Sequence, residues 1–298
     1  MLHRSDMYRS AIIKRLSLLA LSTLILSLSS CNVQPAQTFP VETTSVTEPT
    51  VPATPDTATR DFATVAARPT TVRATDYIFR GERSDPSDPY DATGFVSVGD
   101  VIPDVILDIR YYSGNNFVGD RIDGYEEPLA LLSEEAARAL KSAADQLREQ
   151  GYRLKIFDAY RPQRAVSHFA SWANDREDTR NKAAFYPDID KSLLFDYGYI
   201  AYYSGHCRGS KVDLTLTDQK GKELDMGGTF DYFDTLSHPD YTGITEQQYA
   251  NRMLLREAML DNGFYPCDTE WWDFTLYDEP YPDTSFDFPV SSASLTYK

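Results

Sequence analysis

The sequence is short of basic residues. Its 298 residues include 29 lysines and arginines against 45 aspartates and glutamates, which gives a formal net charge of −16 at pH 7. Surfaces that bind nucleic acid carry a surplus of positive charge, so this balance argues against nucleic acid as a partner. We interpret the excess of acidic side chains as a solvated surface.

The sequence also lacks an apolar N-terminal run long enough to anchor it as a membrane-spanning helix. Such a helix needs roughly 20 apolar residues, and the run over residues 16–28 is shorter. Basic residues precede it, and small residues separate it from Cys31. This order is typical of a bacterial lipoprotein signal, whose cysteine is lipidated and becomes the new N-terminus.

We therefore expect residues 1–31 to be a lipoprotein signal peptide with a lipidated Cys31. The lipid would hold the exported protein at the cell membrane or the outer membrane, with the domain in the periplasm or at the cell exterior. A plain secretory signal with a chance cysteine is the alternative, and it predicts export as well.

Aromatic residues and hydrophobic periodicity are scarce in the segment that follows. Threonine, proline, alanine and valine dominate it up to about residue 75. Such a composition cannot bury enough apolar surface to offset the entropic cost of ordering the chain. We therefore expect residues 32–94 to be a disordered tether, residues 95–290 to form one globular domain, and residues 291–298 to be a tail.

Within this domain, strand-like and helix-like stretches are mixed without a regular rhythm and without internal repeats. Capping residues support two of the helices: Ser133 precedes two glutamates, and Thr245 with Gln248 forms a capping box. The mixture predicts an α+β fold with a mostly antiparallel sheet and flanking helices. The predicted strands are 104–112, 153–160, 211–217 and 270–276, and the predicted helices are 133–150, 162–174 and 245–262.

Histidine is rare, with four in the chain, and one of them stands in the stretch SGHCRGSKVDLTL, residues 204–216. There, His206 and Asp213 are placed as a loop residue and a residue of the following strand. Imidazole and carboxylate groups are metal ligands, so the pair is a candidate metal site. An ordinary turn leading into a buried strand gives the same pattern.

Two acids and one arginine are further candidates. In the stretch TEWWDFTL, Glu270 and Asp273 are three residues apart, and they converge on one ion if a turn begins there. A surface acid pair beside two core tryptophans is the alternative. Arg161 lies between a predicted strand and a helix that starts with proline, which holds its guanidinium at a sheet end. Its alternative role is a salt bridge to Asp158.

Taken together, these segments resemble the D-alanyl-D-alanine dipeptidases of the vancomycin-resistance type. The resemblance rests on four stretches in the same order and spacing, namely NNFVGD (115–120), DAYRPQRA (158–165), SGHCRGSKVDLTL and EWWDFTL. It covers about residues 96–280, essentially the whole globular part. These enzymes are zinc peptidases with the Hedgehog/D,D-carboxypeptidase fold, so the resemblance implies that fold and one zinc ion per chain.

The resemblance assigns a role to most of the candidate residues. It implies that His206 and Asp213 bind zinc, that Glu270 is the general base and that Arg161 stabilises the oxyanion of the tetrahedral intermediate. Two other residues are implied in substrate binding. Ser204 matches a serine near the substrate, and Asp231, in the stretch GGTFDYF, looks like the acid that receives the free ammonium of a dipeptide.

One position departs from the family pattern. The third zinc ligand of the family is the histidine that ends EWWH, and this chain has Asp273 there. One neutral histidine and two carboxylates cancel the charge of zinc, so we expect a less acidic bound water and a slower or more alkaline-shifted enzyme. More oxygen among the ligands also weakens the preference for zinc over harder ions such as Mn²⁺.

The resemblance therefore predicts a metallo-dipeptidase that hydrolyses D-Ala-D-Ala to two amino acids in cell-wall metabolism. A carboxypeptidase that trims peptidoglycan stems is one alternative. A lipoprotein that has lost its metal and only binds peptidoglycan fragments is another, because of Asp273.

The two remaining cysteines flank the candidate ligand segments. Cys207 follows His206, and Cys267 lies three residues before Glu270. If both segments border one metal ion, the sulfurs come close together, and we expect a Cys207–Cys267 disulfide. Two buried free thiols, or Cys207 as a metal ligand, are the alternatives.

Overall fold

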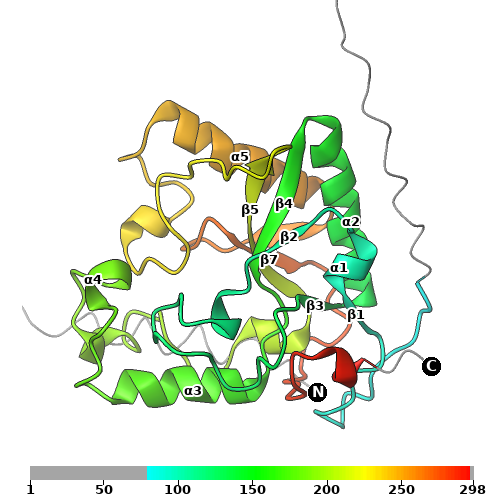
Figure 1. Cartoon of the computed structure of the whole chain (residues 1–298), viewed down its shortest axis with the longest axis horizontal. Helices are drawn as coiled ribbons and strands as arrows, with labels where there is room; N and C mark the ends of the chain where they lie inside the picture. Colours follow the sequence, from blue (N-terminus) through cyan, green and yellow to red (C-terminus); the bar gives the residue numbers. More distant parts are fainter. Residues whose placement is uncertain (1–78, 296–298) are drawn as a thin grey trace, which may run out of the picture. The chain divides into compact units, whose positions relative to one another are not determined.

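A five-stranded sheet lies at the centre of the computed structural model, which describes residues 79–295 (Figure 1). The strands are β1 Phe95–Ser97, β2 Ile106–Leu107, β3 Leu131–Ser133, β4 Tyr152–Asp158, β5 Lys211–Asp218, β6 Phe264–Pro266 and β7 Asp273–Leu276. The order in the large sheet is β2-β4-β5-β7-β6, and β1 pairs with β3 separately. Only β2 and β4 run parallel among these pairs. The predicted α+β class with a mostly antiparallel sheet is confirmed.

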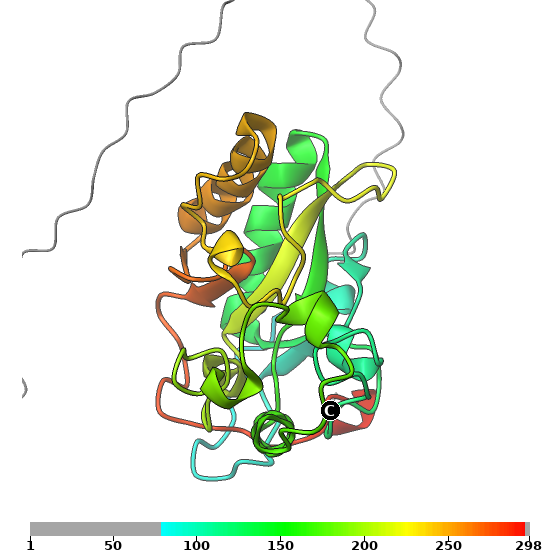
Figure 2. The ribbon, with the colours of Figure 1, turned by 90° about the vertical axis from the view of Figure 1, so that its left-hand side faces the viewer.

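The longer helices begin at the capping residues that the sequence indicates. The helices are α1 Val98–Val101, α2 Glu134–Glu149, α3 Gln163–Asn174, α4 Lys182–Phe185 and α5 Glu246–Asp261. Ser133 caps α2, and Thr245 and Gln248 form both hydrogen bonds of the capping box at α5. Figures 1 and 2 show α2 and α5 side by side next to the sheet, and they also contact each other.

Strand β5 has one face toward the core that contains the helices and the other toward the candidate site. Its side chains Val212, Leu214 and Leu216 are fully buried in the core that includes residues of α2 and α5. Because side chains alternate along a strand, Lys211 and Asp213 point to the opposite face. Both of them line a cavity there.

Two predicted strands are shorter than expected, and both end or begin at a turn. The stretch 104–112 contains only β2, because residues 110–112 form a short 3-10 helix. The stretch 270–276 contains only β7, because the N–H of Asp273 donates a hydrogen bond to the carbonyl of Glu270 across a turn (3.3 Å). This is the turn that allows Glu270 and Asp273 to face the same space.

Residues on both sides of the expected bounds 95–290 make hydrogen bonds with the domain. The carboxylate of Glu134 accepts hydrogen bonds from two backbone N–H groups of the segment 79–94. Near the other end, the hydroxyl of Ser291 donates to Glu127. The predicted signal peptide, the lipidation site Cys31 and most of the expected tether lie outside the described residues. Within residues 79–295, no helix is both long and apolar enough to cross a membrane.

Candidate active site

Three aspartates form a row across three neighbouring strands. Asp213 on β5 stands opposite Asp158 on β4 and opposite Asp273 on β7. A bulge in β4 between Ile156 and Asp158 shifts the register, so that Asp158 rather than Phe157 faces Asp213. All three aspartates are buried. Because like charges directly opposite one another in a sheet repel, the row requires positive charge from its surroundings.

Arg161 supplies positive charge to two members of the row. Its Nε lies 2.9 Å from Oδ2 of Asp158, and its Nη2 lies 3.5 Å from Oδ2 of Asp213. The guanidinium also stacks over the ring of Tyr111, 4.9 Å from the centroid. Arg161 therefore combines the two roles considered from the sequence, since it forms the salt bridge to Asp158 and also lines the cavity at the end of β4.

Asp158 holds Arg161 in place, and each of its two oxygens already has a protein partner. Its Oδ1 accepts a hydrogen bond from the Tyr125 hydroxyl (2.5 Å), and its Oδ2 accepts one from Arg161 (2.9 Å). The side chain is only 1% exposed. Both oxygens are thus engaged, and we regard Asp158 as a positioning residue rather than a metal ligand.

His206 presents Nε2 on the side of Asp213. It lies in the 3-10 helix Gly205–Arg208, directly before β5. Its Nδ1 is 2.7 Å from the carbonyl oxygen of Ala159, which can only accept, so Nδ1 carries the proton. Burial, and then the charge of Arg161, lower the pKa of His206 to about 3, so the ring is neutral. Its Nε2, which carries the lone pair, lies 3.5 Å from Oδ2 of Asp213. This tautomer and the hydrogen bond that supports it are typical of metal-binding histidines.

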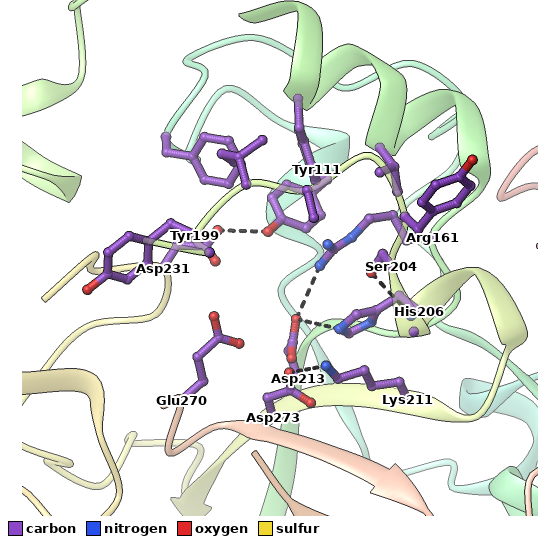
Figure 3. Close-up of a pocket in the computed structure, with 18 of the residues that line it drawn as sticks. Tyr111, Arg161, Tyr199, Ser204, His206, Lys211, Asp213, Asp231, Glu270 and Asp273 are labelled. Atoms are coloured by element: carbon purple, nitrogen blue, oxygen red, sulfur yellow. Dashed lines mark hydrogen bonds and ion pairs between the residues drawn. The ribbon is translucent and has the colours of Figure 1, made fainter. Parts of the chain in front are cut away.

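Glu270 reaches the cavity from the turn before β7. Figure 3 shows its carboxylate in the open space of the site, with Arg161 and His206 on the opposite side. Burial, and then the negative charge of Asp273, raise the pKa of Glu270 well above its ordinary value. A carboxyl group with a raised pKa is suited to exchange protons near neutral pH.

Lys211 is a residue of the site that the sequence analysis missed. Its Nζ lies 2.6 Å from Oδ2 of Asp273. Burial lowers the pKa of Lys211, but the charges of Asp273 and Glu270 outweigh this effect and raise the pKa above its ordinary value. The side chain is therefore a cation. A signal was present in the sequence, because a lysine two residues before Asp213 on a strand must share its face.

The cavity in front of the aspartate row has a volume of about 200 Å³. Pockets for drug-sized ligands measure roughly 300–1,000 Å³, so this space suits a small substrate. The Tyr111 hydroxyl donates to Asp231 on one side (2.9 Å), and the Ser204 hydroxyl accepts from the His206 N–H on the other (3.3 Å). The cavity is lined by all seven non-cysteine residues predicted for the site, namely Arg161, Ser204, His206, Asp213, Asp231, Glu270 and Asp273.

Asp231 gives the stability of the protein a predictable pH dependence. Burial, and then the charge of Asp213, raise its pKa from 3.8 to about 8. A buried acid with a raised pKa binds a proton more tightly in the folded state than in the unfolded state. Its stabilising contribution is therefore complete below about pH 4 and is lost as the pH rises through about 8.

We predict that Asp231→Asn removes this dependence. Between about pH 5 and about pH 8, the unfolding free energy of the wild type should decline by up to about 1.4 kcal/mol per pH unit more steeply than that of the variant. Urea unfolding at several pH values measures both slopes. The exposed Asp240→Asn is the control and should follow the wild type. Equal slopes for Asp231→Asn and the wild type would contradict the prediction.

The predicted disulfide between Cys207 and Cys267 is wrong, because both cysteines are free. The Sγ of Cys207 lies 3.7 Å from Oε1 of Gln163 in α3, and that of Cys267 lies 3.4 Å from Oγ1 of Thr269. Consecutive side chains of the 3-10 helix point in different directions. The turn that directs His206 into the cavity therefore directs Cys207 toward α3, which also argues against Cys207 as a metal ligand.

Part of the donor set fits a metal ion well. Oδ1 of Asp213 and Oδ1 of Asp273 are buried and have no hydrogen-bond partner. Buried carboxylate oxygens without a partner are costly, and a cation would satisfy them. A cation would also separate the His206 lone pair from the Asp213 carboxylate. A nitrogen donor and carboxylate oxygens are ligands that zinc accepts.

The third predicted ligand stands slightly apart from the other two. Ligand atoms within 4.8 Å of one another fall into two groups in the described part of the chain. One contains His206 and Asp213, together with Asp158, and the other contains Asp273 with Glu270 and Cys267. The predicted set of His206, Asp213 and Asp273 is thus divided between two adjacent groups.

Comparison with known proteins shows the family to which the chain belongs. The family model described as D-ala-D-ala dipeptidase, peptidase family M15, matches residues 91–291. The D-alanyl-D-alanine dipeptidase of Enterococcus faecium is 40% identical over 198 residues, which is 66% of this chain and 98% of the relative. That of Escherichia coli is 31% identical over 186 residues, 62% of this chain and 86% of the relative.

A similar solved structure is that of a vancomycin-resistance D,D-pentapeptidase in complex with Zn(II). It is 12% identical with a TM-score of 0.32, and the match covers 52% of this chain and 78% of that chain. The family match and the identity to the dipeptidases show that the chain belongs to the M15 family of D-Ala-D-Ala dipeptidases. The resemblance found in the sequence is thereby confirmed.

Proposed function

We propose that this protein is a metal-dependent dipeptidase that hydrolyses D-Ala-D-Ala to two molecules of D-alanine. The observation that carries the proposal is the arrangement around one small cavity. A neutral histidine and unpartnered carboxylate oxygens lie at its base, and Glu270 and Arg161 face each other across it. Membership of the dipeptidase family supports the substrate, since the curated relatives carry that name.

The metal site would be formed by Nε2 of His206 and by the carboxylates of Asp213 and Asp273, with one zinc ion as the expected occupant. Zinc bound there would act as a Lewis acid on the scissile carbonyl and lower the pKa of a water molecule. Glu270 is placed to take a proton from the attacking water and to return it to the leaving amine, which is the role its raised pKa suits.

Arg161 and Asp231 would each bind one charged group, the developing oxyanion and the substrate ammonium respectively. Arg161 is fixed by Asp158 and Asp213, so its remaining N–H groups are preorganised for the negative charge that develops on the carbonyl oxygen. Asp231 closes the other side of the cavity and receives a hydrogen bond from Tyr111. The raised pKa of Asp231 keeps it largely protonated near pH 7 in the free protein. The ammonium group of a bound dipeptide would favour its carboxylate form and bind to it, which a stem-trimming carboxypeptidase does not require.

A second candidate function, the binding of peptidoglycan fragments without turnover, depends on one contact of Asp273. The ammonium group of Lys211 contacts Asp273, the carboxylate proposed as the third metal ligand. A protein that never exchanges this contact for a metal would keep Arg161 and Asp231 as binding groups for a dipeptide and would not hydrolyse it.

Metal analysis combined with dipeptide turnover distinguishes the two functions. The purified protein should contain close to one zinc ion per chain and release D-alanine from D-Ala-D-Ala. An N-acetylated D-Ala-D-Ala should be a poor substrate, since its ammonium is blocked, with kcat/KM lowered by roughly 10–100-fold. Metal-free protein that binds the dipeptide without hydrolysis would decide for the binding function. Equal turnover of the blocked substrate would decide for a carboxypeptidase.

We also propose that the protein is an exported lipoprotein anchored through Cys31. The basic start, the short apolar run and the small residues before this cysteine support the proposal. Mass spectrometry of the protein isolated from membranes should find a diacylglycerol group on Cys31, and Cys31→Ser should release the domain from the membrane fraction. A Cys31→Ser protein that is processed and remains in the membrane fraction would contradict the anchor.

A further inference from the structure

Lys211 occupies a position inside the proposed metal site. Its Nζ is 2.6 Å from Oδ2 of Asp273, the carboxylate proposed as third ligand, and this contact is a salt bridge with a side chain that is only 2% exposed. The same carboxylate has a second oxygen with no hydrogen-bond partner. Asp273 is therefore half satisfied by a cation that belongs to the protein itself.

The Lys211 side chain crosses the site close to the turn that carries His206. A Cβ added at Gly205 would lie 3.1 Å from Cδ of Lys211 and 3.1 Å from Nη2 of Arg208, so the lysine stem passes closely over the backbone of the turn that carries His206. The stem thus lies between the segment of His206 and the segment of Asp273. Figure 3 shows the Lys211 ammonium below Asp213, on the side of the site where Asp273 lies.

Electrostatics explains why a cation is held there. Asp213 and Asp273 stand opposite each other on adjacent strands, and Glu270 is close by. Arg161 contacts Asp213 but no contact joins it to Asp273 in the described structure. Lys211 is then the basic residue that neutralises the Asp273 end of the row, and without it the buried carboxylate would lack a counter-charge.

We propose that Lys211 is a positioning residue that competes with the metal ion for Asp273. The ammonium holds Oδ2 of this carboxylate when no metal is bound, and a metal ion that binds Asp273 displaces it because two cations at one carboxylate repel each other. The inference rests on the proposed function, because it concerns the same metal site. It follows that the metal affinity is lower than the three ligands would give without Lys211. It also follows that the ligand side chains keep their positions in the metal-free protein.

The first experiment measures zinc affinity directly. The metal-free full chain is titrated with Zn²⁺ against a chromophoric chelator, as wild type, Lys211→Met and Lys211→Arg. We expect Lys211→Met to lower the dissociation constant by about tenfold or more, whereas Lys211→Arg keeps the competing charge and binds no more tightly than the wild type.

Lys155→Met is the matched control for this titration. Lys155 also lies on the central sheet and also pairs with two acids, Asp108 at 2.8 Å and Glu223 at 2.9 Å. It does not line the cavity. Its substitution should leave the zinc affinity unchanged.

The second experiment uses the wild-type protein and needs no variant to fold. Lys211 is acetylated with acetic anhydride in the metal-free protein and in the presence of Zn²⁺, and the modification is quantified by mass spectrometry. Zinc should displace the ammonium from Asp273 and increase the acetylation of Lys211, while Lys155 is modified equally in both states. An unchanged or reduced reactivity of Lys211 would overturn the proposal.

The outcomes separate this inference from the proposed function. If the wild type and Lys211→Met bind zinc with equal affinity, the competition is refuted while the metal site stands. If Lys211→Met binds more weakly than the wild type, Lys211 supports the metal instead, and the inference is again refuted. If none of the proteins binds zinc, the proposed function fails and the competition fails with it.

Discussion

Replacing Glu270 with glutamine should lower kcat for D-Ala-D-Ala by about 10²–10⁴-fold and leave the zinc content unchanged. General acid–base catalysis by a placed side chain contributes an effect of about this size. Glutamine keeps the shape of the side chain but cannot accept the proton of the attacking water. The carboxylate of Glu270 lies in the cavity next to Asp273, so it faces the water that would attack the substrate.

The raised pKa of Glu270 makes this prediction sharper. Burial and the charge of Asp273 raise the pKa of the free carboxyl, so the base should lose its proton at a higher pH than an ordinary glutamate does. The acidic limb of kcat/KM against pH should therefore reflect Glu270 in the wild type and should be absent from the residual activity of Glu270→Gln.

Glu223→Gln is the control, because Glu223 pairs with Lys155 outside the cavity. It should keep the wild-type kcat. A Glu270→Gln enzyme with kcat within about threefold of the wild type would assign proton transfer to another group. A loss of zinc together with activity would show instead that Glu270 is a metal ligand.

The sequence was sufficient for the fold class and for seven of the residues that line the cavity, although it missed Lys211. Caps at Ser133 and Thr245 are local signals, since each depends on residues within one helical turn, and both are present in the structure. The candidates drawn from residue patterns line one cavity, together with Ser204 and Asp231, which the family resemblance added. The turn at Glu270 was anticipated as the condition under which Glu270 and Asp273 converge, and the structure contains it.

What the sequence did not reveal depends on register and on directions within turns. The row of Asp158, Asp213 and Asp273 requires a bulge in β4, and no local pattern specifies which residue is bulged. The disulfide was expected because its two cysteines flank the ligand segments. Closeness along the chain did not determine where the Cys207 side chain points within a 3-10 helix.

Lys211 shows a different limit of sequence reasoning. Its position on β5 and its face could be read from the alternation of the strand. Its partner could not, because several acids converge on this end of the sheet only after folding. The family pattern draws attention to Asp273 and gives no role to Lys211. Only the distance between Lys211 and Asp273 in the folded chain connects the two residues.

Replacing Arg161 with alanine should have the largest effect on stability of any single change at the site. The substitution leaves the buried carboxylates of Asp158 and Asp213 without their shared counter-charge, and their side chains are only 1% and 3% exposed. Breaking a buried ion pair by removing one partner costs about 3–5 kcal/mol. The same change removes the donor proposed for the oxyanion, so kcat should decrease by about 10²–10³-fold as well.

A second substitution separates the two effects. Arg161→Ala leaves two buried carboxylates without a counter-charge, and Arg161→Ala/Asp158→Asn removes one of them. The double variant should therefore recover part of the lost unfolding free energy without recovering kcat. Urea unfolding and steady-state kinetics of both variants measure this. Arg148→Ala is the control, because Arg148 pairs with half-exposed acids at the surface and its loss should cost about 1 kcal/mol or less. If the double variant regained full activity, Arg161 would matter only for stability, and the oxyanion would need another donor.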